Sequence, residues 1–128
     1  MSNKDQLVAV YGSLRKGFGN HSVMERAGGE YFFTGKTKEN YDLHDLGYFP
    51  SVSKAHNTNG TPVVVEVFAV DEGGLKGPLD TLEGFPDFYN RSLTKVVDEE
   101  GKEFDVWLYH IDRANGPVVR SGDWRYKV

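Results

Sequence analysis

The run Pro62–Val70 constrains the fold more than any other part of the chain. It is apolar at every position except Glu66, and valine supplies most of it. A short, continuous apolar run of this kind is typical of a central strand that is covered on both faces. A carboxylate within such a strand is expensive to bury without partners. We therefore expect Glu66 to be a hydrogen-bonded or rim-facing structural carboxylate, in preference to a functional one.

Shorter runs with strand character lie on either side of this segment, and turn residues separate them. β-Branched and aromatic residues are enriched in strands, whereas clusters of Gly, Asn, Asp and Pro mark turns. The predicted strands cover Leu7–Val10, Glu30–Thr37, Asn40–Leu46, Ser51–Ser53, Phe88–Val97 and Glu103–His110. The predicted turns are Gly47–Pro50, Asn57–Gly60 and the hairpin turn Asp98–Lys102.

Two short helices complete the predicted elements. The first covers His21–Arg26, and Asn20 is placed to cap its N-terminus. The second covers about Pro78–Glu83, because leucines recur there at helical spacing, proline suits a first turn and Gly84 suits a C-terminal cap.

The number of short strands predicts an α+β domain that is mostly β and spans residues 1–128. A small closed or nearly closed barrel would protect the edges of its strands. The tail Ile111–Val128 has no regular pattern, and Trp124 is its candidate anchor.

Composition narrows the class of protein. The chain has no cysteine and a formal net charge of −4, with scattered basic residues that do not favour nucleic-acid binding. No apolar run has membrane-spanning length, the N-terminus is no signal peptide, and the four histidines lack metal-site spacing. We expect a cytoplasmic monomer that binds a small, anionic molecule, with no metal, nucleic-acid or membrane partner.

The segment Tyr11–His21 is the first candidate site. Backbone N–H groups at the Gly12-Ser13 turn can form a concave site for a carboxylate or an oxyanion, and Arg15 and Lys16 add positive charge. The alternative is a purely structural connector between strand and helix. A nucleophilic role for Ser13 with His21 is less favoured, because no Gly-x-Ser-x-Gly elbow surrounds the serine.

Glu83 is the second candidate. It falls in the last turn of the predicted helix, where the negative end of the macrodipole raises a carboxyl pKa, and Phe85 and Phe88 can add desolvation. A glutamate with a raised pKa is a better general base near neutral pH. The alternative is a solvated carboxylate at a helix end.

Two motifs stand in order along the chain. The first is Tyr11–Gly17 with Asn20–His21, and the second is Asp80–Pro86 followed by Tyr89 and Arg91. Both resemble signature segments of the gamma-glutamylcyclotransferase-like family, and most closely those of its gamma-glutamylamine cyclotransferase branch. The resemblance covers roughly residues 7–110.

The strand before the second motif also resembles the family, although Val65 stands where the family usually has a glycine. The resemblance implies a six- or seven-stranded barrel flanked by short helices, with a pocket at one end. It implies that the α-amino group of a gamma-glutamyl substrate attacks its own γ-carbonyl, which releases 5-oxoproline and a free amine or amino acid without consuming water. No cofactor takes part.

The same resemblance assigns roles to particular residues. Glu83 would be the general acid/base. The gamma-glutamyl group would be cradled by Tyr11, Gly12, Ser13 and Leu14. Tyr89 and Tyr109 are candidates for orienting the ligand, with a structural role as the alternative for each.

Two other functions remain open at this level. One is a non-catalytic binding module for a small carboxylate ligand on the same fold, since fold does not determine function. The other is an interaction protein that uses an exposed aromatic patch. The leaving group also stays open among amino acids, gamma-glutamyl-lysine and larger conjugates.

Overall fold

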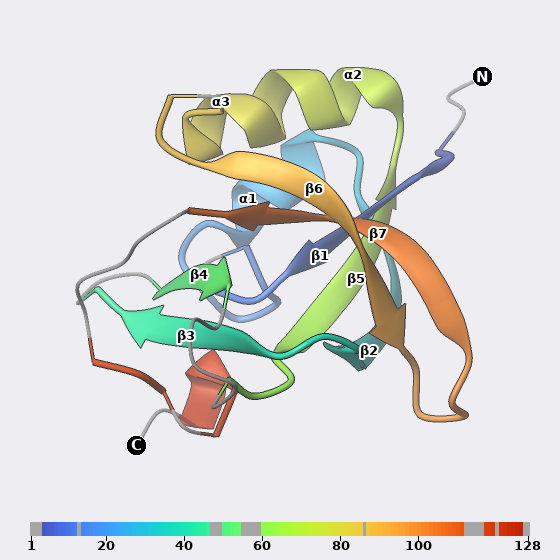
Figure 1. The fold of residues 1–128 in the computed structure, drawn as a ribbon. Coiled ribbons are helices and arrows are strands. Elements are labelled where there is room, and N and C mark those ends of the chain that lie inside the picture. The colour runs from blue at the N-terminus through green and yellow to red at the C-terminus, as the bar shows by residue number, and fades with distance from the viewer. Residues whose placement is uncertain are drawn as a thin grey trace.

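Five strands of the chain close into a barrel (Figure 1). The computed structural model describes residues 4–12, 14–46, 50–54, 60–85, 87–111, 117–119 and 121–126. The barrel strands, in spatial order, are β1 (Gln6–Val10), β5 (Val64–Val70), β2 (Glu30–Thr37), β6 (Asn90–Val97) and β7 (Glu103–His110). Neighbouring strands pair antiparallel except at the closure, where β1 runs parallel to β7. None of the described helices is long and apolar enough to cross a membrane.

The remaining two strands form a separate antiparallel pair, β3 (Tyr41–Asp45) and β4 (Pro50–Lys54). The fold class predicted from the sequence is confirmed: a mostly β domain with a closed barrel and short helices. The strand count needs a correction, because the ring in the described residues has five strands, whereas six or seven were expected. Because β1 pairs with β7, the ring is closed and has no free strand edge with which β3 or β4 could pair.

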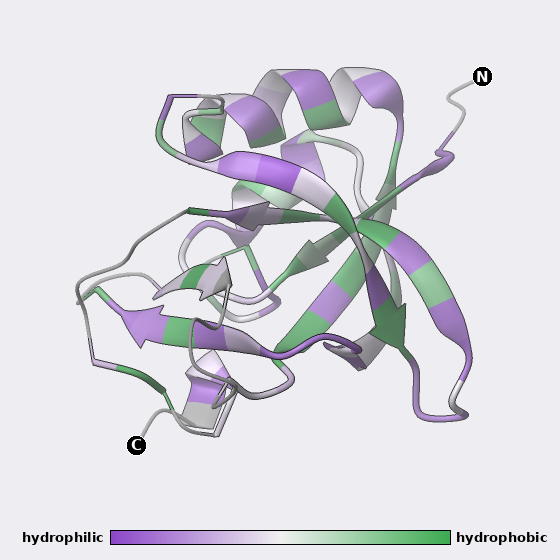
Figure 2. Ribbon diagram, viewed as in Figure 1, coloured by the Kyte–Doolittle hydropathy of each residue, from purple (hydrophilic) through white to green (hydrophobic). Residues whose placement is uncertain are grey.

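The prediction of a central, doubly covered β5 is confirmed. The strand pairs with β1 on one side and β2 on the other. Val65 and Val67 pack in a core with β3, β4 and the C-terminal segment, whereas Phe68 and Val70 pack in a second core with the helices. Apolar residues follow one another along this strand in Figure 2, interrupted by Glu66. The continuous apolar run therefore reflects two cores on opposite faces.

A continuous helical stretch lies across one end of the barrel, built from α2 (Glu72–Gly74), the π-helical turn η1 (Leu75–Leu79) and α3 (Asp80–Glu83) (Figure 1). The predicted helix was too short at its N-terminal end. The stretch begins after Asp71, whose side chain accepts a hydrogen bond from the Gly74 amide at 2.7 Å. Pro78 lies inside the π-helical turn, where the i→i+4 bonding pattern that proline interrupts is already altered.

Gly84 ends the helical stretch, as the sequence predicted. It adopts φ 67° and ψ 33°, the left-handed conformation that glycine takes most readily. Helix α1 (His21–Arg26) is also confirmed, but Asn20 makes no side-chain capping bond to it. Its φ of −99° and ψ of 10° differ from the extended conformation that a capping residue uses, which explains this correction.

The C-terminal segment packs back onto the barrel through Trp124. Its side chain is buried in the core, which confirms it as an anchor, and it opens the short 3₁₀ helix η2 (Trp124–Tyr126). The Val64 amide donates to the Gly122 carbonyl at 2.7 Å, so the segment is tied to β5. The predicted hairpin turn Asp98–Lys102 is confirmed. The turns predicted at Gly47–Pro50 and Asn57–Gly60 rest mainly on residues 47–49 and 57–59, outside the described residues.

Candidate active site

A cavity of about 320 Å³ opens where β1 ends. Its inner wall comes from β1 and the segment that follows, and it includes Tyr11, Gly12 and Leu14. Tyr89 and Tyr109 also line it, from the start of β6 and the end of β7. The end of α3 and the residues beyond it form the opposite wall.

The structure brings most of the sequence-predicted site residues together in this cavity. Tyr11, Gly12, Leu14, Glu83, Tyr89 and Tyr109 all line it. Ser13 lies outside the described residues. Asn20, which the sequence suggested as a helix cap, lines the cavity as well.

The turn after β1 is closely packed, which explains the glycine within it. A Cβ atom at Gly12 would collide with the ring of Pro50, the first residue of β4. The Arg15 amide donates to the Gly12 carbonyl at 3.0 Å and closes the turn. The Leu14 carbonyl lies 2.9 Å from Nδ1 of His21, which ties the turn to the start of α1. The backbone at Gly12 is therefore closely packed, and that at Leu14 is hydrogen-bonded, beside the cavity.

Glu83 is the only described residue with a carboxylate that lines the cavity. Its burial raises the pKa of the carboxyl group from the ordinary value of 4.5 to about 7. No hydrogen bond or ion pair joins the Glu83 carboxylate to another described residue. Desolvation without a compensating donor disfavours the charged form. Near neutral pH this carboxyl group can therefore both accept and release a proton.

Three tyrosine hydroxyls surround this part of the cavity, and each already donates a hydrogen bond. Tyr11 donates to the Tyr109 carbonyl at 2.8 Å and Tyr89 to the Pro50 carbonyl at 3.1 Å. Tyr109 donates to Oδ1 of Asp80 at 2.6 Å. Burial is the first cause that raises the pKa of all three hydroxyls, and the charge of Glu83 adds to it. The tyrosines therefore stay protonated at neutral pH.

Asp80 contacts the cavity residue Tyr109, and it was not predicted from the sequence as a site residue. It accepts from Nε of Arg91 at 2.8 Å and from Nη2 at 3.0 Å, a bidentate pair that raises the pKa of Arg91. The guanidinium carbon of Arg91 lies 4.5 Å from the ring centroid of Phe85 and 4.6 Å from that of Trp107. Asp80 thus joins α3 to β6 and to Tyr109, one turn before Glu83. The sequence signal that could have identified Asp80 is its position in the second motif, three residues before Glu83.

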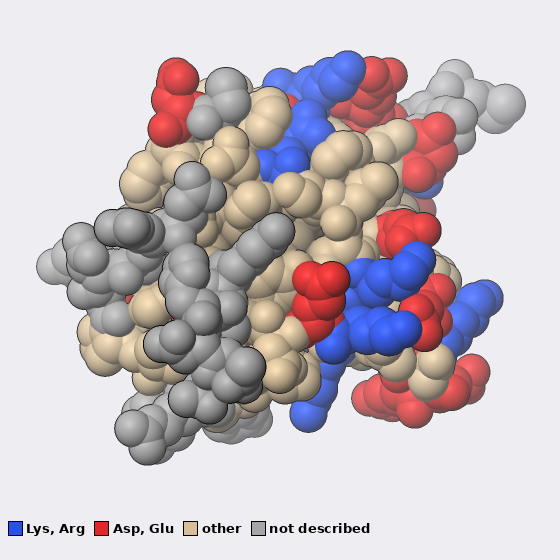
Figure 3. All heavy atoms as spheres, viewed as in Figure 1, with Lys and Arg blue, Asp and Glu red and all other residues tan. Residues whose placement is uncertain are grey.

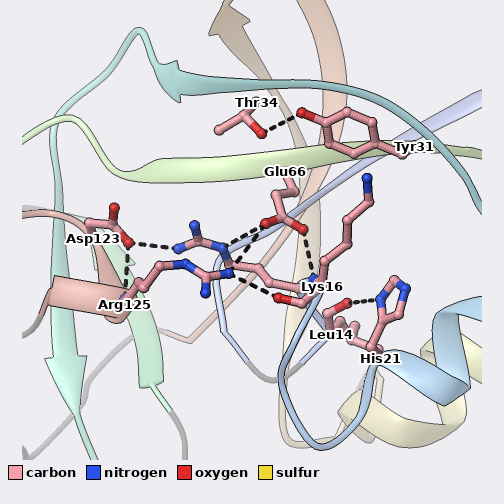
Figure 4. A network of polar contacts seen from close by, with 9 residues as sticks. Leu14, Lys16, His21, Tyr31, Thr34, Glu66, Asp123 and Arg125 are labelled. Carbon is pink, nitrogen blue, oxygen red and sulfur yellow. Dashed lines mark hydrogen bonds and ion pairs between the residues drawn. The ribbon is translucent and has the colours of Figure 1, made fainter.

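The positive charges of the first motif do not line the cavity. The Arg15 side chain is 5% exposed, with Nε 3.3 Å from Oε2 of Glu66 and Nη1 2.7 Å from Oδ1 of Asp123. Figure 4 shows Glu66 directed toward this loop, where it also accepts from the Lys16 amide at 2.8 Å. The prediction that Glu66 is hydrogen-bonded is confirmed. The expectation that Arg15 serves an anion is corrected, because its partners are protein carboxylates.

Two further contacts hold the same loop. Nζ of Lys16 lies 3.6 Å from the ring centroid of Tyr31 (Figure 4), and Lys16 does not line the cavity. Arg125 donates to the Lys16 carbonyl at 2.9 Å. The C-terminal segment therefore fixes the loop whose first residues line the cavity.

Charged residues elsewhere on the surface are mixed. On the face that Figure 3 shows, acidic and basic side chains lie side by side. Exposed ion pairs of the chain include Lys95–Asp105 and Lys38–Glu103. Among the described residues no group of three His, Cys, Asp or Glu side chains is arranged to hold a metal ion. The described lining of the cavity, by contrast, brings together one carboxyl group and three phenolic hydroxyls.

A family model described as gamma-glutamyl cyclotransferase, AIG2-like, matches residues 8–126. The chain belongs to this family. A protein of Methanocaldococcus jannaschii named "Putative gamma-glutamylcyclotransferase MJ1514" is 40% identical over 120 residues, which cover 94% of this chain and 96% of that protein. Gamma-glutamylaminecyclotransferase C of Danio rerio is 30% identical, with 91% of this chain and 85% of that protein covered.

The fold agrees with the family assignment. The crystal structure of an AIG2-like protein from Mus musculus matches with a TM-score of 0.79 at 25% identity, over 90% of this chain and 86% of that one. The names of the relatives include both gamma-glutamylcyclotransferases and a gamma-glutamylaminecyclotransferase. The sequence prediction is therefore confirmed for the family, whereas its assignment to the amine branch is not established by these names.

Proposed function

We propose that this protein is a gamma-glutamyl cyclotransferase that releases 5-oxoproline from a gamma-glutamyl amine or a gamma-glutamyl amino acid. The observation that carries the proposal is the Glu83 carboxyl group, which lines a cavity and has a pKa raised to about 7 by burial. A general acid/base works best when its pKa lies near the operating pH.

The reaction uses Glu83 twice. Its carboxylate takes a proton from the substrate α-ammonium, and the neutral amine attacks the γ-carbonyl carbon of the same molecule. The new C–N bond closes a five-membered ring, and the carbonyl oxygen becomes an oxyanion. When the oxyanion collapses, the bond to the leaving nitrogen breaks and Glu83 returns the proton to that nitrogen. Because the α-ammonium has a second proton to lose, the product ring nitrogen keeps one hydrogen, and one proton passes to solvent or to the released amine.

The other cavity residues would position the substrate. We assign the backbone of Tyr11, Gly12, Ser13 and Leu14 to the gamma-glutamyl group, whose reacting ends must be held in a near-attack geometry. Tyr89 and Tyr109 would shape the walls around it. The closely packed turn at Gly12 supports this assignment, because a rigid backbone needs no reorganisation as charge develops.

The cavity size supports a small-molecule substrate. A volume of about 320 Å³ lies at the lower end of the range for small-molecule sites, roughly 300–1,000 Å³. The gamma-glutamyl group and a short leaving group are of that scale. No step of this mechanism requires a metal or an organic cofactor.

The reaction is tested by incubating the protein with gamma-glutamyl amides in ¹⁸O-labelled water and analysing the products by mass spectrometry. Cyclisation yields 5-oxoproline without heavy oxygen, because no water is consumed. Hydrolysis would instead give glutamate that carries ¹⁸O, and that product would refute the proposed reaction. Saturable binding without any product would favour a non-catalytic carboxylate-binding module.

A matched pair of variants tests the role of Glu83. Glu83→Gln removes the proton acceptor with little change of shape, so we expect turnover to fall by roughly 10²-fold or more. Glu72→Gln changes a glutamate whose side chain is 67% exposed in α2 and should retain turnover. Full activity in Glu83→Gln would remove this residue from the mechanism.

A further inference from the structure

The cavity changes in character from its inner wall to its mouth. The inner residues Val10, Tyr11 and Tyr109 are at most 7% exposed. At the outer wall the side chains of Leu82 and Phe88 are 39% and 54% exposed. Both are apolar. Leu82 directly precedes Glu83 in the sequence, and Phe88 follows Glu83 after the turn at the end of α3. A substrate whose reacting carbonyl lies at Glu83 therefore places its far end against two exposed apolar side chains.

The outer wall is held in place by the end of α3. The Phe88 amide donates to the Gly84 carbonyl at 2.7 Å, directly beyond the helix cap. The Phe88 ring contacts Tyr89 edge-on, with 4.8 Å between ring centroids. A large aromatic side chain that is fixed at its backbone and against a cavity residue, yet half exposed, presents a ready apolar contact surface at the mouth of the cavity.

The charges around the cavity, like its exposed apolar side chains, favour an uncharged leaving group. Among the described residues that line it, none is Lys, Arg or His, and Glu83 is the only carboxylic acid. A carboxylate on the leaving group would meet no cationic side chain among these lining residues and would lie near the like charge of Glu83. A second ammonium would be desolvated against Leu82 and Phe88, and its charge would lower the pKa that lets Glu83 act near neutral pH.

We propose that the protein prefers gamma-glutamyl amides whose leaving amine carries an uncharged, apolar substituent, and that Leu82 and Phe88 form the subsite for this substituent. The proposal rests on the proposed cyclotransferase function and specifies its substrate class. The proposal distinguishes simple apolar amines from two charged kinds of leaving group. Free amino acids carry a carboxylate, and lysine that leaves through its side-chain amine still carries its charged α-groups. The two side chains act on specificity and are not catalytic residues.

The test uses three amides that share a four-carbon leaving group. These are gamma-glutamyl-butylamide, the gamma-glutamyl amide of 4-aminobutyrate and the mono-gamma-glutamyl amide of 1,4-diaminobutane. Their far ends are neutral, anionic and cationic. Release of 5-oxoproline from each gives kcat/KM, and we expect the neutral amide to be favoured by ~10-fold or more over both charged ones. Equal values, or a preference for either charged amide, would overturn this inference and leave the cyclotransferase function intact.

Variants then locate the preference. Leu82→Ala and Phe88→Ala should each lower kcat/KM for the butylamide by ~5-fold or more, with a much smaller effect on the two charged amides. The matched control is Leu93→Ala, because Leu93 is 59% exposed in β6 and does not line the cavity. An unchanged preference in both rim variants would overturn the assignment of the subsite. No 5-oxoproline from any of the three amides would overturn the proposed function and this inference with it.

Discussion

Arg15 and Glu66 form a buried ion pair across the first motif and the central strand, with Nε 3.3 Å from Oε2 and side chains 5% and 7% exposed. Asp123 completes the cluster by accepting from Nη1 of Arg15 at 2.7 Å. The loop that begins at Gly12 is thereby fixed at both β5 and the C-terminal segment. The geometry of one cavity wall consequently depends on charges that never contact the cavity.

Asp123→Asn tests this dependence. The change removes one of two carboxylates around the Arg15 guanidinium, and breaking a buried charge pair is costly. We expect the free energy of unfolding to fall by about 1–3 kcal/mol in urea titrations. Asp105→Asn is the matched control, since its partner Lys95 is exposed, and it should leave stability close to that of the parent. Equal losses in the two variants would contradict a special role for the buried cluster.

Gly84→Ala tests how the helix end places the outer wall. Gly84 and Gly101 both have positive φ, 67° and 85°, so alanine at either should cost about 1 kcal/mol of stability. Only at Gly84 would the new Cβ atom approach a cavity residue, 3.1 Å from Cβ of Phe88. We therefore expect Gly84→Ala to reduce 5-oxoproline release and Gly101→Ala to preserve it. Loss of activity in both would attribute the effect to stability alone.

Tyr109→Phe tests whether this hydroxyl acts on Asp80 or on substrate. The hydroxyl already donates to Asp80 at 2.6 Å. When the hydroxyl is removed, Asp80 keeps its ion pair with Arg91. We expect a loss of about 1 kcal/mol in stability and a change in kcat/KM of less than about fivefold. A decrease of 100-fold or more with an intact fold would show that the hydroxyl contacts the substrate.

Glu83→Gln should alter how stability depends on pH. The pKa of Glu83 in the folded protein is about 7, above the ordinary value of 4.5 expected in the unfolded chain. The contribution of this group is therefore full below pH 4.5 and is lost as the pH rises through 7. The loss amounts to at most about 3 kcal/mol. Relative to the parent, Glu83→Gln should gain stability between pH 4.5 and pH 8 in urea titrations, and a pH-independent difference would contradict the raised pKa.

Local patterns were sufficient for most of the fold. The strand predicted at Glu30–Thr37 has those same bounds in the structure, because its aromatic and β-branched residues are flanked by glycine turns. The parallel closure between β1 and β7 could not be predicted, since pairing of distant segments depends on how all strands fit together. The helix was predicted too short because Pro78 was interpreted as a first-turn residue, whereas the helical stretch begins directly after Asp71.

The residues that line the candidate site were predictable where they belong to a motif. Gly12 and Glu83 were identified in that way, and both line the cavity. The partners of Arg15 could not be identified, because Glu66 and Asp123 are far from it in sequence. A pair of adjacent basic residues favours an anion-binding interpretation, whereas the fold supplies carboxylates from two other segments. The contacts of Asp80 with Arg91 and Tyr109 were also not identified, because the motif gives the position of Asp80 and not which side chains it meets in the fold.

The pH dependence of kcat/KM for 5-oxoproline release tests the central role of Glu83 most directly. With a carboxyl pKa of about 7, the rate should decline roughly tenfold for each pH unit below that value, since the base is then protonated. Glu83→Gln should lose both the activity and this acid limb. An acid limb centred near 4.5, or a Glu83→Gln protein with the parental rate and pH profile, would contradict the assignment of Glu83 as general acid/base.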